Sequence, residues 1–366
     1  MSLSIGIVGL PNVGKSTLFN ALTKKAVPAE NYPFCTIDPS VGIVPVPDSR
    51  LQALTELSHS AKTLPAVIEF VDIAGLVSGA SKGEGLGNQF LAHIRDTDVI
   101  LQMVRIFEDK DVIHVHGKVD PLRDVGVINI ELVLADTETV SKRLGNLARE
   151  VKRGDVSAKK EQVVLEKALA VLEDTKPIRI LDLSDDERAI IRGLNLLTSK
   201  PVIFGLNRKS GAENLDTIPN DPRWTALLEY FKKEKASFVI LDAGVEHEVK
   251  DFEGEEKEAF RTELGAEADG IDALIKTGYA ALGLITFFTT GEDETRGWTI
   301  KKGSTAPIAG TAIHTDFLDK FIRAEVVAYD KLIGAGSYAH ARDLGVVRTE
   351  GKEYIVKDGD VIEFRI

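Results

Sequence analysis

Apolar residues, many of them β-branched, form short runs that alternate with segments of mixed polarity over the first two thirds of the chain. These runs predict buried strands at 4–10, 67–73, 99–106, 201–207 and 237–242. The segments between them have helical character. Strands that alternate with helices predict an α/β fold in which helices cover both faces of a mostly parallel sheet.

Nearly a hundred residues separate the third strand from the fourth, whereas a crossover between parallel strands needs about a dozen. From about Ile128 the apolar positions follow helical spacing, first at Val140, Leu144, Leu147 and Val151 and then at Val164, Ala168, Val171 and Leu172. We therefore predict a helical insert at 128–199, folded as an antiparallel hairpin with its loop near Gly154. The insert interrupts a sheet domain formed by 1–127 and 200–280.

The region 281–366 has a different pattern. Strand-like stretches are "LITFFTTG", "GWTIKKGST" and "YIVKDGDVIEFRI", and the pair Asp358 and Gly359 is typical of a hairpin turn. Between them, "HTDFLDKFIRAEVV" predicts one helix. We expect a small mixed α+β domain with Trp298 and Phe317 in its core.

The composition narrows the class of protein. The chain of 366 residues has 43% hydrophobic and 28% charged residues, as soluble globular proteins do. Its formal net charge of −12 argues against a general nucleic-acid coat protein but leaves room for a local basic patch. Cys35 is the only cysteine, which fits a reducing cytosol. We find no basic n-region and no apolar run of about 20 residues, so we expect a cytoplasmic protein without signal peptide or membrane span.

The segment "GLPNVGKS", from Gly9 to Ser16, matches the phosphate-binding loop G-x-x-x-x-G-K-[ST]. Gly9 and Gly14 let the backbone approach phosphate, and Lys15 brings a positive charge to the β- and γ-phosphates. The Ser16 hydroxyl is placed to bind Mg²⁺. The helix that begins after the loop adds the attraction of its dipole. We assign the phosphate contacts to Asn12, Val13, Gly14, Lys15, Ser16 and Thr17.

Two further segments follow in the order expected of a nucleotide-dependent switch. "VDIAGL" places Asp72 at the end of a predicted strand, where it can hold a Mg²⁺-bound water, and Gly75 where its N–H can meet the γ-phosphate. "NYPFCTIDPSVG" offers Thr36 as a second Mg²⁺ ligand. The neighbouring Cys35 is either a small buried apolar residue or a thiol whose oxidation disturbs the switch.

Together the phosphate loop, "NYPFCTIDP", "DIAGL" and "GASKGEGLGNQFL" resemble the Obg branch of P-loop GTPases. With the helical insert and "RGWTIKKGSTAP", "IHTDF" and "YIVKDGDVIEF", the whole chain resembles the Obg-like ATPase family of the YchF type. This resemblance implies that 281–366 is a TGS domain with a β-grasp fold that docks on RNA or ribosome surfaces. It also implies ATP as the substrate.

The residues that would read the base differ from those of GTPases, whose N-K-x-D motif ends in an Asp that accepts two hydrogen bonds from guanine. Asn207 occupies the Asn position, but Ser210 occupies the Asp position. Each lost charge-assisted bond costs about 1.5–3 kcal/mol, so guanine preference is weakened. Asn207 can still pair with adenine N6–H and N7. Alternatively, "NRKS" is only a loop and the base is read elsewhere. The family usually carries an acidic residue where this chain has Ser210.

Leu76 stands where Ras-like enzymes place the Gln that orients the attacking water. Hydrolysis is therefore either slow or assisted by another group. The resemblance implies that this group is His114, in "FEDKDVIHVHGKVDP". A neutral imidazole can orient or deprotonate the attacking water. From the residues alone, His114 and His116 are also consistent with an exposed loop, or with a zinc site that lacks evident further ligands.

Three other features leave alternatives open. Arg95 and Arg105 are either arginine fingers or ordinary ion-pairing residues. Seven basic and two acidic residues between 142 and 160 give the predicted hairpin tip a local charge of +5, which is either a solvated end or a contact for the RNA backbone. Asn12 either suits a tight turn or helps to hold K⁺ against the phosphates.

The sequence therefore predicts a monomeric, Mg²⁺-dependent P-loop ATPase that binds the ribosome or ribosomal RNA, and neither DNA nor a membrane. Its predicted catalytic residues are Lys15 and His114, and its metal site is formed by Ser16, Thr36 and Asp72. The alternatives are a ribosome-assembly GTPase and a nucleotide-gated binding protein whose hydrolysis is incidental.

Overall fold

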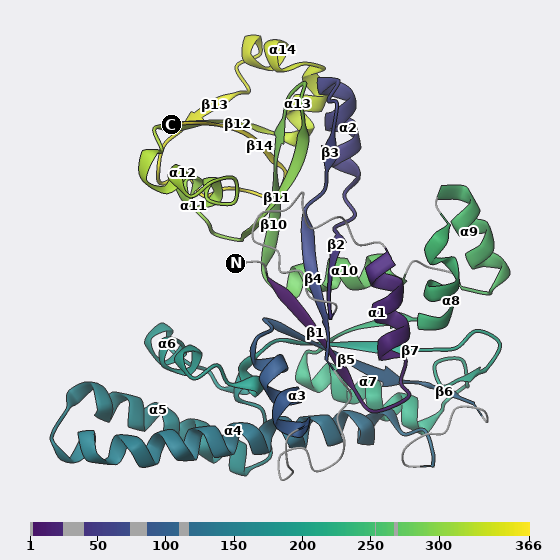
Figure 1. The fold of residues 1–366 in the computed structure, drawn as a ribbon, viewed down its shortest axis with the longest axis vertical. Helices are drawn as coiled ribbons and strands as arrows, with labels where there is room; N and C mark the ends of the chain where they lie inside the picture. The colour runs from purple at the N-terminus through teal and green to yellow at the C-terminus, as the bar shows by residue number, and fades with distance from the viewer. Residues whose placement is uncertain (1–2, 25–39, 74–85, 110–116, 253, 267–269) are drawn as a thin grey trace. The chain divides into compact units, whose positions relative to one another are not determined.

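The computed structural model describes residues 3–24, 40–73, 86–109, 117–252, 254–266 and 270–366 (Figure 1). Among these residues two compact units are formed, the first by those within 3–24, 40–42 and 69–274 and the second by those within 43–68 and 275–366. The sequence pattern placed 43–68 in the sheet domain and the start of the last domain at 281. In the structure 43–68 instead joins the carboxyl-terminal unit.

A six-stranded sheet in the order β2-β4-β1-β5-β7-β9 is the centre of the first unit, and the ends of β2 and β4 that fall within 43–68 connect it to the segment that joins the second unit. Its strands are β1 (Ser4–Gly9), β2 (Val41–Pro45), β4 (Val67–Asp72), β5 (Val99–Arg105), β7 (Val202–Asn207) and β9 (Ser237–Leu241). The pairs β1–β4, β1–β5, β5–β7 and β7–β9 are all parallel. The five predicted strands are thus confirmed, and β2 is an edge strand that the pattern did not reveal. Because the strands are parallel, their carboxyl ends meet at one edge of the sheet, where ligands of such folds bind.

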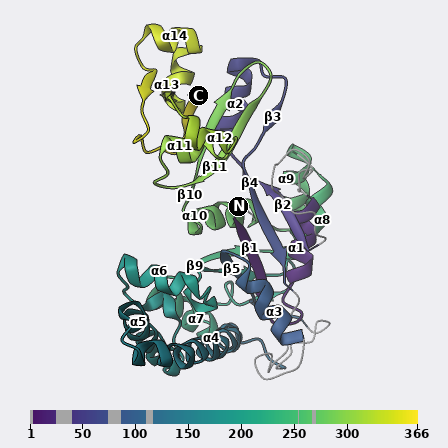
Figure 2. The ribbon, with the colours of Figure 1, turned by 60° about the vertical axis from the view of Figure 1, so that its left-hand side comes forward.

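Figures 1 and 2 show the helices of the first unit, some of which flank this sheet. They are α1 (Lys15–Lys24), α3 (Leu86–Arg95), α4 (Pro121–Lys152), α5 (Val156–Glu173), α6 (Asp185–Gly193), α7 (Pro222–Glu234), α8 (Ala243–Glu248) and α9 (Gly254–Glu263), with short 3₁₀ turns at Ile178–Ile180, Leu197–Ser199 and Val249–Asp251. Helix α10 (Gly270–Ala281) begins in the first unit and continues into the second. In both views α1 lies on one side of the strands, and α4 and α7 lie on the other. Phe204 of β7 packs against Phe231 of α7 with ring centroids 4.8 Å apart. A small antiparallel pair, β6 (Phe107–Glu108) and β8 (Glu213–Asn214), lies outside the main sheet.

The predicted helical hairpin is confirmed in α4 and α5, which lie side by side (Figure 2). Helix α4 begins earlier than predicted, because Asp120 caps it by accepting a hydrogen bond from the Arg123 N–H and Pro121 suits the first turn. Gly154, with φ of 88°, makes the turn, and Asp155 caps α5. The hairpin core includes Val140, Leu147, Val164, Leu165, Ala168 and Leu172, so most positions read from the helical spacing are buried.

The second unit contains a mixed sheet in the order β13-β12-β14-β10-β11-β3. Its strands are β3 (Thr63–Leu64), β10 (Leu284–Thr290), β11 (Thr295–Lys301), β12 (Arg323–Ala328), β13 (Arg348–Glu350) and β14 (Asp360–Arg365). Its helices are α2 (Ser49–Ser58), α11 (Ala306–Gly310), α12 (Asp316–Lys320), α13 (Tyr329–Ala335) and α14 (Tyr338–Asp343). The order of the five carboxyl-terminal strands is that of a β-grasp fold. Leu51 and Leu54 of α2 pack on Phe288 and Val361, which is why 43–68 belongs here.

Two local predictions for this unit are wrong. The segment 314–327 was expected to be one helix, but only Asp316–Lys320 is helical and Arg323–Ala328 is strand β12. Within that strand Ala324 and Val326 are buried and pair with β14. Because alternate residues of a strand face the same side, burial of these two positions favours a strand over a helix. Gly359 does turn the chain, with φ of 84°, but it does not join two strands of a hairpin. Instead the Asp358 carboxylate accepts hydrogen bonds from the Thr286 N–H at 2.9 Å and from Arg50 at 2.8 Å.

The expected core positions of this unit are partly buried. Trp298 packs against the core cluster around Phe287, and the Phe317 ring meets Phe364 edge-on with centroids 5.4 Å apart. Across the described ranges, we find no helix that combines the length and apolar character needed to cross a membrane.

Candidate nucleotide-binding site

The phosphate loop joins β1 to α1 at the carboxyl edge of the parallel sheet. Gly9 has φ of 156°, and a Cβ there would lie 2.7 Å from the Met103 carbonyl oxygen. Gly14 has φ of 96°, and a Cβ there would lie 2.4 Å from the Asn207 amide nitrogen. Both glycines are therefore required by packing within the protein, in addition to the approach of phosphate that the sequence suggested.

Asn12 is exposed within this loop and has φ of 61°. Asparagine tolerates this left-handed conformation better than most residues, so the turn alone accounts for its presence. A contact of Asn12 with K⁺ stays a prediction.

Lys15 lies inside the loop with only 8% of its surface exposed. Its ammonium donates a hydrogen bond to the Leu10 carbonyl at 2.8 Å. Burial lowers the pKa of Lys15, and the negative charge of Asp72 opposes this shift. Burial in turn raises the pKa of Asp72, and Lys15 opposes that. The loop therefore holds a desolvated cation close to a carboxylate, an arrangement that an incoming polyphosphate anion would stabilise.

Two of the three predicted Mg²⁺ residues can be placed. Ser16 is exposed in the first turn of α1, and Asp72 ends β4, in register with Ile7 of the neighbouring strand β1. A hydroxyl and a carboxylate are the hard oxygen donors that Mg²⁺ prefers, and Mg²⁺ commonly completes its shell with water and substrate phosphates. The described donors therefore fit Mg²⁺. Thr36, the third predicted ligand, lies outside the described residues.

Other predicted site residues also lie outside the part of the chain that the structure describes. These are Gly75 and Leu76 of the second switch segment, Cys35, and the two histidines His114 and His116. Their assignments remain predictions.

Asn207 has a different task from the bidentate adenine contact that the sequence suggested. It is 5% exposed, its amide nitrogen donates to the Val13 carbonyl at 2.9 Å, and its amide oxygen accepts from the Ala243 N–H at 2.9 Å. The side chain therefore ties the phosphate loop to the start of α8. One amide N–H is left to contact a base, and N7 is an acceptor in both adenine and guanine. Asn207 alone thus cannot discriminate between the two bases.

The residue that replaces the guanine-reading carboxylate is also placed. The Ser210 N–H donates to the Asp242 carboxylate at 2.6 Å. Asp242 also caps α8 by accepting from the N–H groups of Gly244 and Val245 at 3.0 and 3.1 Å. The Asp242 carboxylate is thus engaged by three backbone donors. Asp242 and Ala243 were missed from the sequence, although an Asp followed by small residues after a buried strand could have indicated them.

The two arginine-finger candidates bond within the protein. Arg95 donates to the Thr139 hydroxyl of α4 at 2.8 Å. Arg105 is 1% exposed and donates to the Phe107 and Asp109 carbonyls at 2.9 and 3.3 Å. These contacts hold both side chains on protein groups. Nearby carboxylates attract them as well, Asp109 in the case of Arg105 and Asp136 in the case of Arg95, as the ion-pairing alternative expected.

The basic hairpin tip carries six exposed cations, Lys142, Arg149, Lys152, Arg153, Lys159 and Lys160. The seventh, Arg143, forms a double hydrogen bond with Glu161 across the hairpin at 2.6 and 2.8 Å. Its charge is therefore neutralised in the structure.

The parallel sheet and its phosphate loop define a P-loop nucleotide-binding protein, and its relatives show that its class is that of nucleotide hydrolases. Family models described as "50S ribosome-binding GTPase" and "Protein of unknown function (DUF933)", the latter labelled YchF-GTPase_C, match residues 4–134 and 284–366. The "Ribosome-binding ATPase YchF" of Bacillus subtilis (strain 168) is 51% identical over 365 residues, covering 100% of this chain and 99% of that protein. This chain belongs to the YchF family, as the resemblance predicted.

Further relatives support the same family. The protein of the same name from Escherichia coli O157:H7 is 49% identical over 364 residues, with 100% of this chain and 99% of the relative covered. Among solved structures, that of the Schizosaccharomyces pombe YchF GTPase matches with a TM-score of 0.87 at 39% identity, covering 100% of this chain and 98% of that one. The likeness thus extends over the whole chain, including the helical hairpin and the β-grasp unit.

Proposed function

We propose that the protein is a Mg²⁺-dependent ATPase that prefers ATP to GTP and acts as a nucleotide-dependent switch on the ribosome. One observation carries the base preference: Ser210 stands where a guanine-reading carboxylate is needed, and the adjacent Asp242 is turned onto backbone N–H groups. Guanine would then present two N–H donors without a carboxylate to accept them. The expected penalty is about 1.5–3 kcal/mol for each charge-assisted bond that is not made.

Lys15 and the loop N–H groups would neutralise charge that develops on the phosphates during cleavage. Ser16 and Asp72, together with Thr36, would hold Mg²⁺, which when bound supplies Lewis acidity at the phosphate oxygens. His114 is proposed to orient the attacking water, because Leu76 lacks a hydrogen-bonding group. Asn207 would keep the phosphate loop in its binding shape through its contact with Val13.

A monovalent cation is a second proposed cofactor. The Asn12 side chain is exposed in the loop, and its amide oxygen would help to hold K⁺ beside the phosphates. The ion would supply the positive charge that an arginine finger gives other switches. The two described arginine candidates are engaged with protein groups, which supports a different source for this charge.

Association with the ribosome is supported by the names of the relatives, which are described as ribosome-binding ATPases. We propose that the hairpin tip contacts the ribosomal RNA backbone, since its exposed cations stand out on a chain with a net charge of −12. We also propose that the protein is cytoplasmic and monomeric. Lys152→Glu combined with Lys159→Glu should weaken ribosome binding and flatten its salt dependence, whereas the same changes at exposed Lys232 and Lys233 of α7 should not. Equal losses for both pairs would contradict the assignment.

Isothermal titration with non-hydrolysable ATP and GTP analogues tests the base preference. We expect ATP to bind at least about tenfold more tightly, and Ser210→Asp to raise GTP affinity. Equal or tighter GTP binding by the unaltered chain would favour the ribosome-assembly GTPase instead. Single-turnover hydrolysis with and without ribosomes separates an ATPase from a nucleotide-gated binding protein, in which neither condition would give appreciable turnover.

A further inference from the structure

The β-grasp sheet opens between two of its central strands. β10 and β14 run in parallel, but among the described residues their pairing consists of Phe288 with Val361. β10 nevertheless continues to Thr290 and β14 to Arg365, and each remains paired with its other neighbour, β11 or β12, to that end. The two strands therefore diverge, and the backbone edges that face each other beyond this pair make no further ladder within the described part of the sheet.

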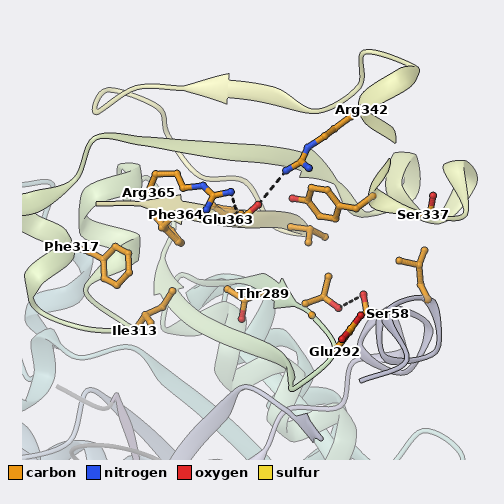
Figure 3. Close-up of a pocket in the computed structure, with 16 residues that line it drawn as sticks. Ser58, Thr289, Glu292, Ile313, Phe317, Ser337, Arg342, Glu363, Phe364 and Arg365 are labelled. Carbon is orange, nitrogen blue, oxygen red and sulfur yellow. Dashed lines mark hydrogen bonds and ion pairs between the residues drawn. The ribbon is translucent and has the colours of Figure 1, made fainter. Parts of the chain in front are cut away.

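The opening is a cavity of about 570 Å³ (Figure 3). The two faces of the sheet give it walls of different chemistry. Ile313, Phe317 and Phe364 form an apolar wall on one face, and Ser337, Tyr338 and Arg342 form a polar wall on the other. Apolar and polar walls on opposite faces match the alternation of side chains along an extended chain.

Of the described charged side chains that line the opening, the basic ones form ion pairs and one acidic one does not. Arg342 pairs with Glu325 at 2.6 Å and with Glu363 at 3.4 Å, and Arg365 pairs with Glu363 at 2.7 Å, so the basic groups are neutralised. Glu292, which also lines the cavity, is exposed and forms no ion pair with any residue that the structure describes. An acidic group at the rim is therefore available to a cation.

A buried hydroxyl on the polar wall also lacks a partner. The Tyr338 phenol oxygen is buried and makes no hydrogen bond within the described ranges. Burial, with the negative charges of Glu363 and Glu325, raises the pKa of Tyr338 to about 12, so the hydroxyl stays protonated at neutral pH. Because this oxygen is closed to solvent, the carbonyl of a bound peptide unit would reach it only if the Tyr338 side chain moved.

We propose that the opening between β10 and β14 binds an extended polypeptide segment by strand addition. Its backbone would pair with the two facing edges, and alternate apolar side chains would pack on Phe317 and Phe364. A Lys or Arg of the segment would reach Glu292. Beyond the Phe288–Val361 pair, β10 offers two residues and β14 four, about 7 and 13 Å of edge at roughly 3.3 Å per residue. About two residues of the partner can therefore pair with both edges, and its next residues with β14 alone.

The test uses the full chain and a displayed library of random heptapeptides as the probe. Enriched sequences should alternate apolar and polar residues and carry a Lys or Arg. A synthetic peptide of the enriched sequence should raise the hydrogen-exchange protection of the Ile362–Phe364 amides. Its analogue with alternate N-methylated peptide bonds, which cannot pair with both edges, should bind at least tenfold more weakly.

Glu292→Gln should weaken binding of this peptide by about two- to fivefold, the range expected for one exposed ion pair. Asp293→Asn in the same turn is the matched control, because Asp293 does not line the cavity, and it should leave the affinity unchanged. Failure to enrich any sequence, equal binding of the N-methylated analogue, or equal effects of the two substitutions would each overturn the proposal. None of these readouts depends on nucleotide, so they are independent of the proposed ATPase activity.

Discussion

Asn207→Ala is expected to loosen the phosphate loop rather than to change the choice of base. The amide joins Val13 to Ala243 through two hydrogen bonds of 2.9 Å, and Ala243 is 1% exposed. Loss of the bond to Val13 costs about 0.5–1.5 kcal/mol, and the buried Ala243 N–H left without its partner costs about 1–3 kcal/mol. We therefore expect the free energy of unfolding to fall by about 2–4 kcal/mol.

Chemical denaturation measures this loss, and isothermal titration measures its effect on nucleotides. The loop is predicted to contact the phosphates, which ATP and GTP share, so analogues of both should lose affinity together. The loss should be about tenfold for each 1.4 kcal/mol of free energy needed to return the loop to its binding shape. Asn207→Asp keeps an acceptor for Ala243 but sets a buried carboxylate oxygen against the Val13 carbonyl oxygen, so it should lower the stability at least as much as Asn207→Ala. Asn20→Ala, at an exposed position of α1, is the control and should have little effect.

The opposite pattern would refute this reasoning. If Asn207→Ala lowers only ATP affinity and leaves the stability unchanged, Asn207 reads adenine, as the sequence suggested, and its contacts with Val13 and Ala243 have no energetic importance. Stability that falls while both affinities stay unchanged would show that the contact matters for folding but not for the shape of the loop.

Three further predictions concern the chemistry of the site. Lys15→Ala should abolish tight triphosphate binding, because the charge-assisted contact is lost, and a titration that shows affinity within about twofold of the parent would exclude this role. His114→Ala should slow single-turnover ATP hydrolysis with little change in ATP affinity, whereas His116→Ala, the paired control, should not; a parallel loss of binding would return His114 to a loop residue. ATP hydrolysis should be faster in K⁺ than in Na⁺ at equal ionic strength, and Asn12→Ala should remove the difference; identical rates in the two salts would leave Asn12 as a turn residue.

Much of the nucleotide-binding unit could be predicted because its signals are local. The phosphate loop is a contiguous motif, and each of its residues acts within a few positions of its neighbours. The five buried strands are short apolar runs, and the hairpin has helical spacing that Gly154 interrupts. Both patterns follow from the geometry of a single element, so they are visible without knowledge of what that element packs against.

The β-grasp unit was predicted less well, because its elements depend on distant partners. Residues 323–328 follow a segment with helical character, yet they form a strand because β14 offers a ladder and a buried face. The segment 43–68 lies more than two hundred residues before the core that Leu51 and Leu54 complete. Local periodicity records which residues are apolar but not which distant surface covers them.

The same distinction holds within the candidate sites. The sequence by itself predicted a triphosphate site and the residues that would carry its charge and its metal-binding oxygens, and it showed that a carboxylate is missing at Ser210. Only the tertiary structure decided that Asn207 braces the phosphate loop and that Asp242 is occupied by backbone N–H groups. It alone also placed an opening between β10 and β14. Each of these depends on atoms from strands far apart in the chain that meet at one edge of a sheet, and a hydrogen-bond partner at that distance leaves no pattern in the order of the residues.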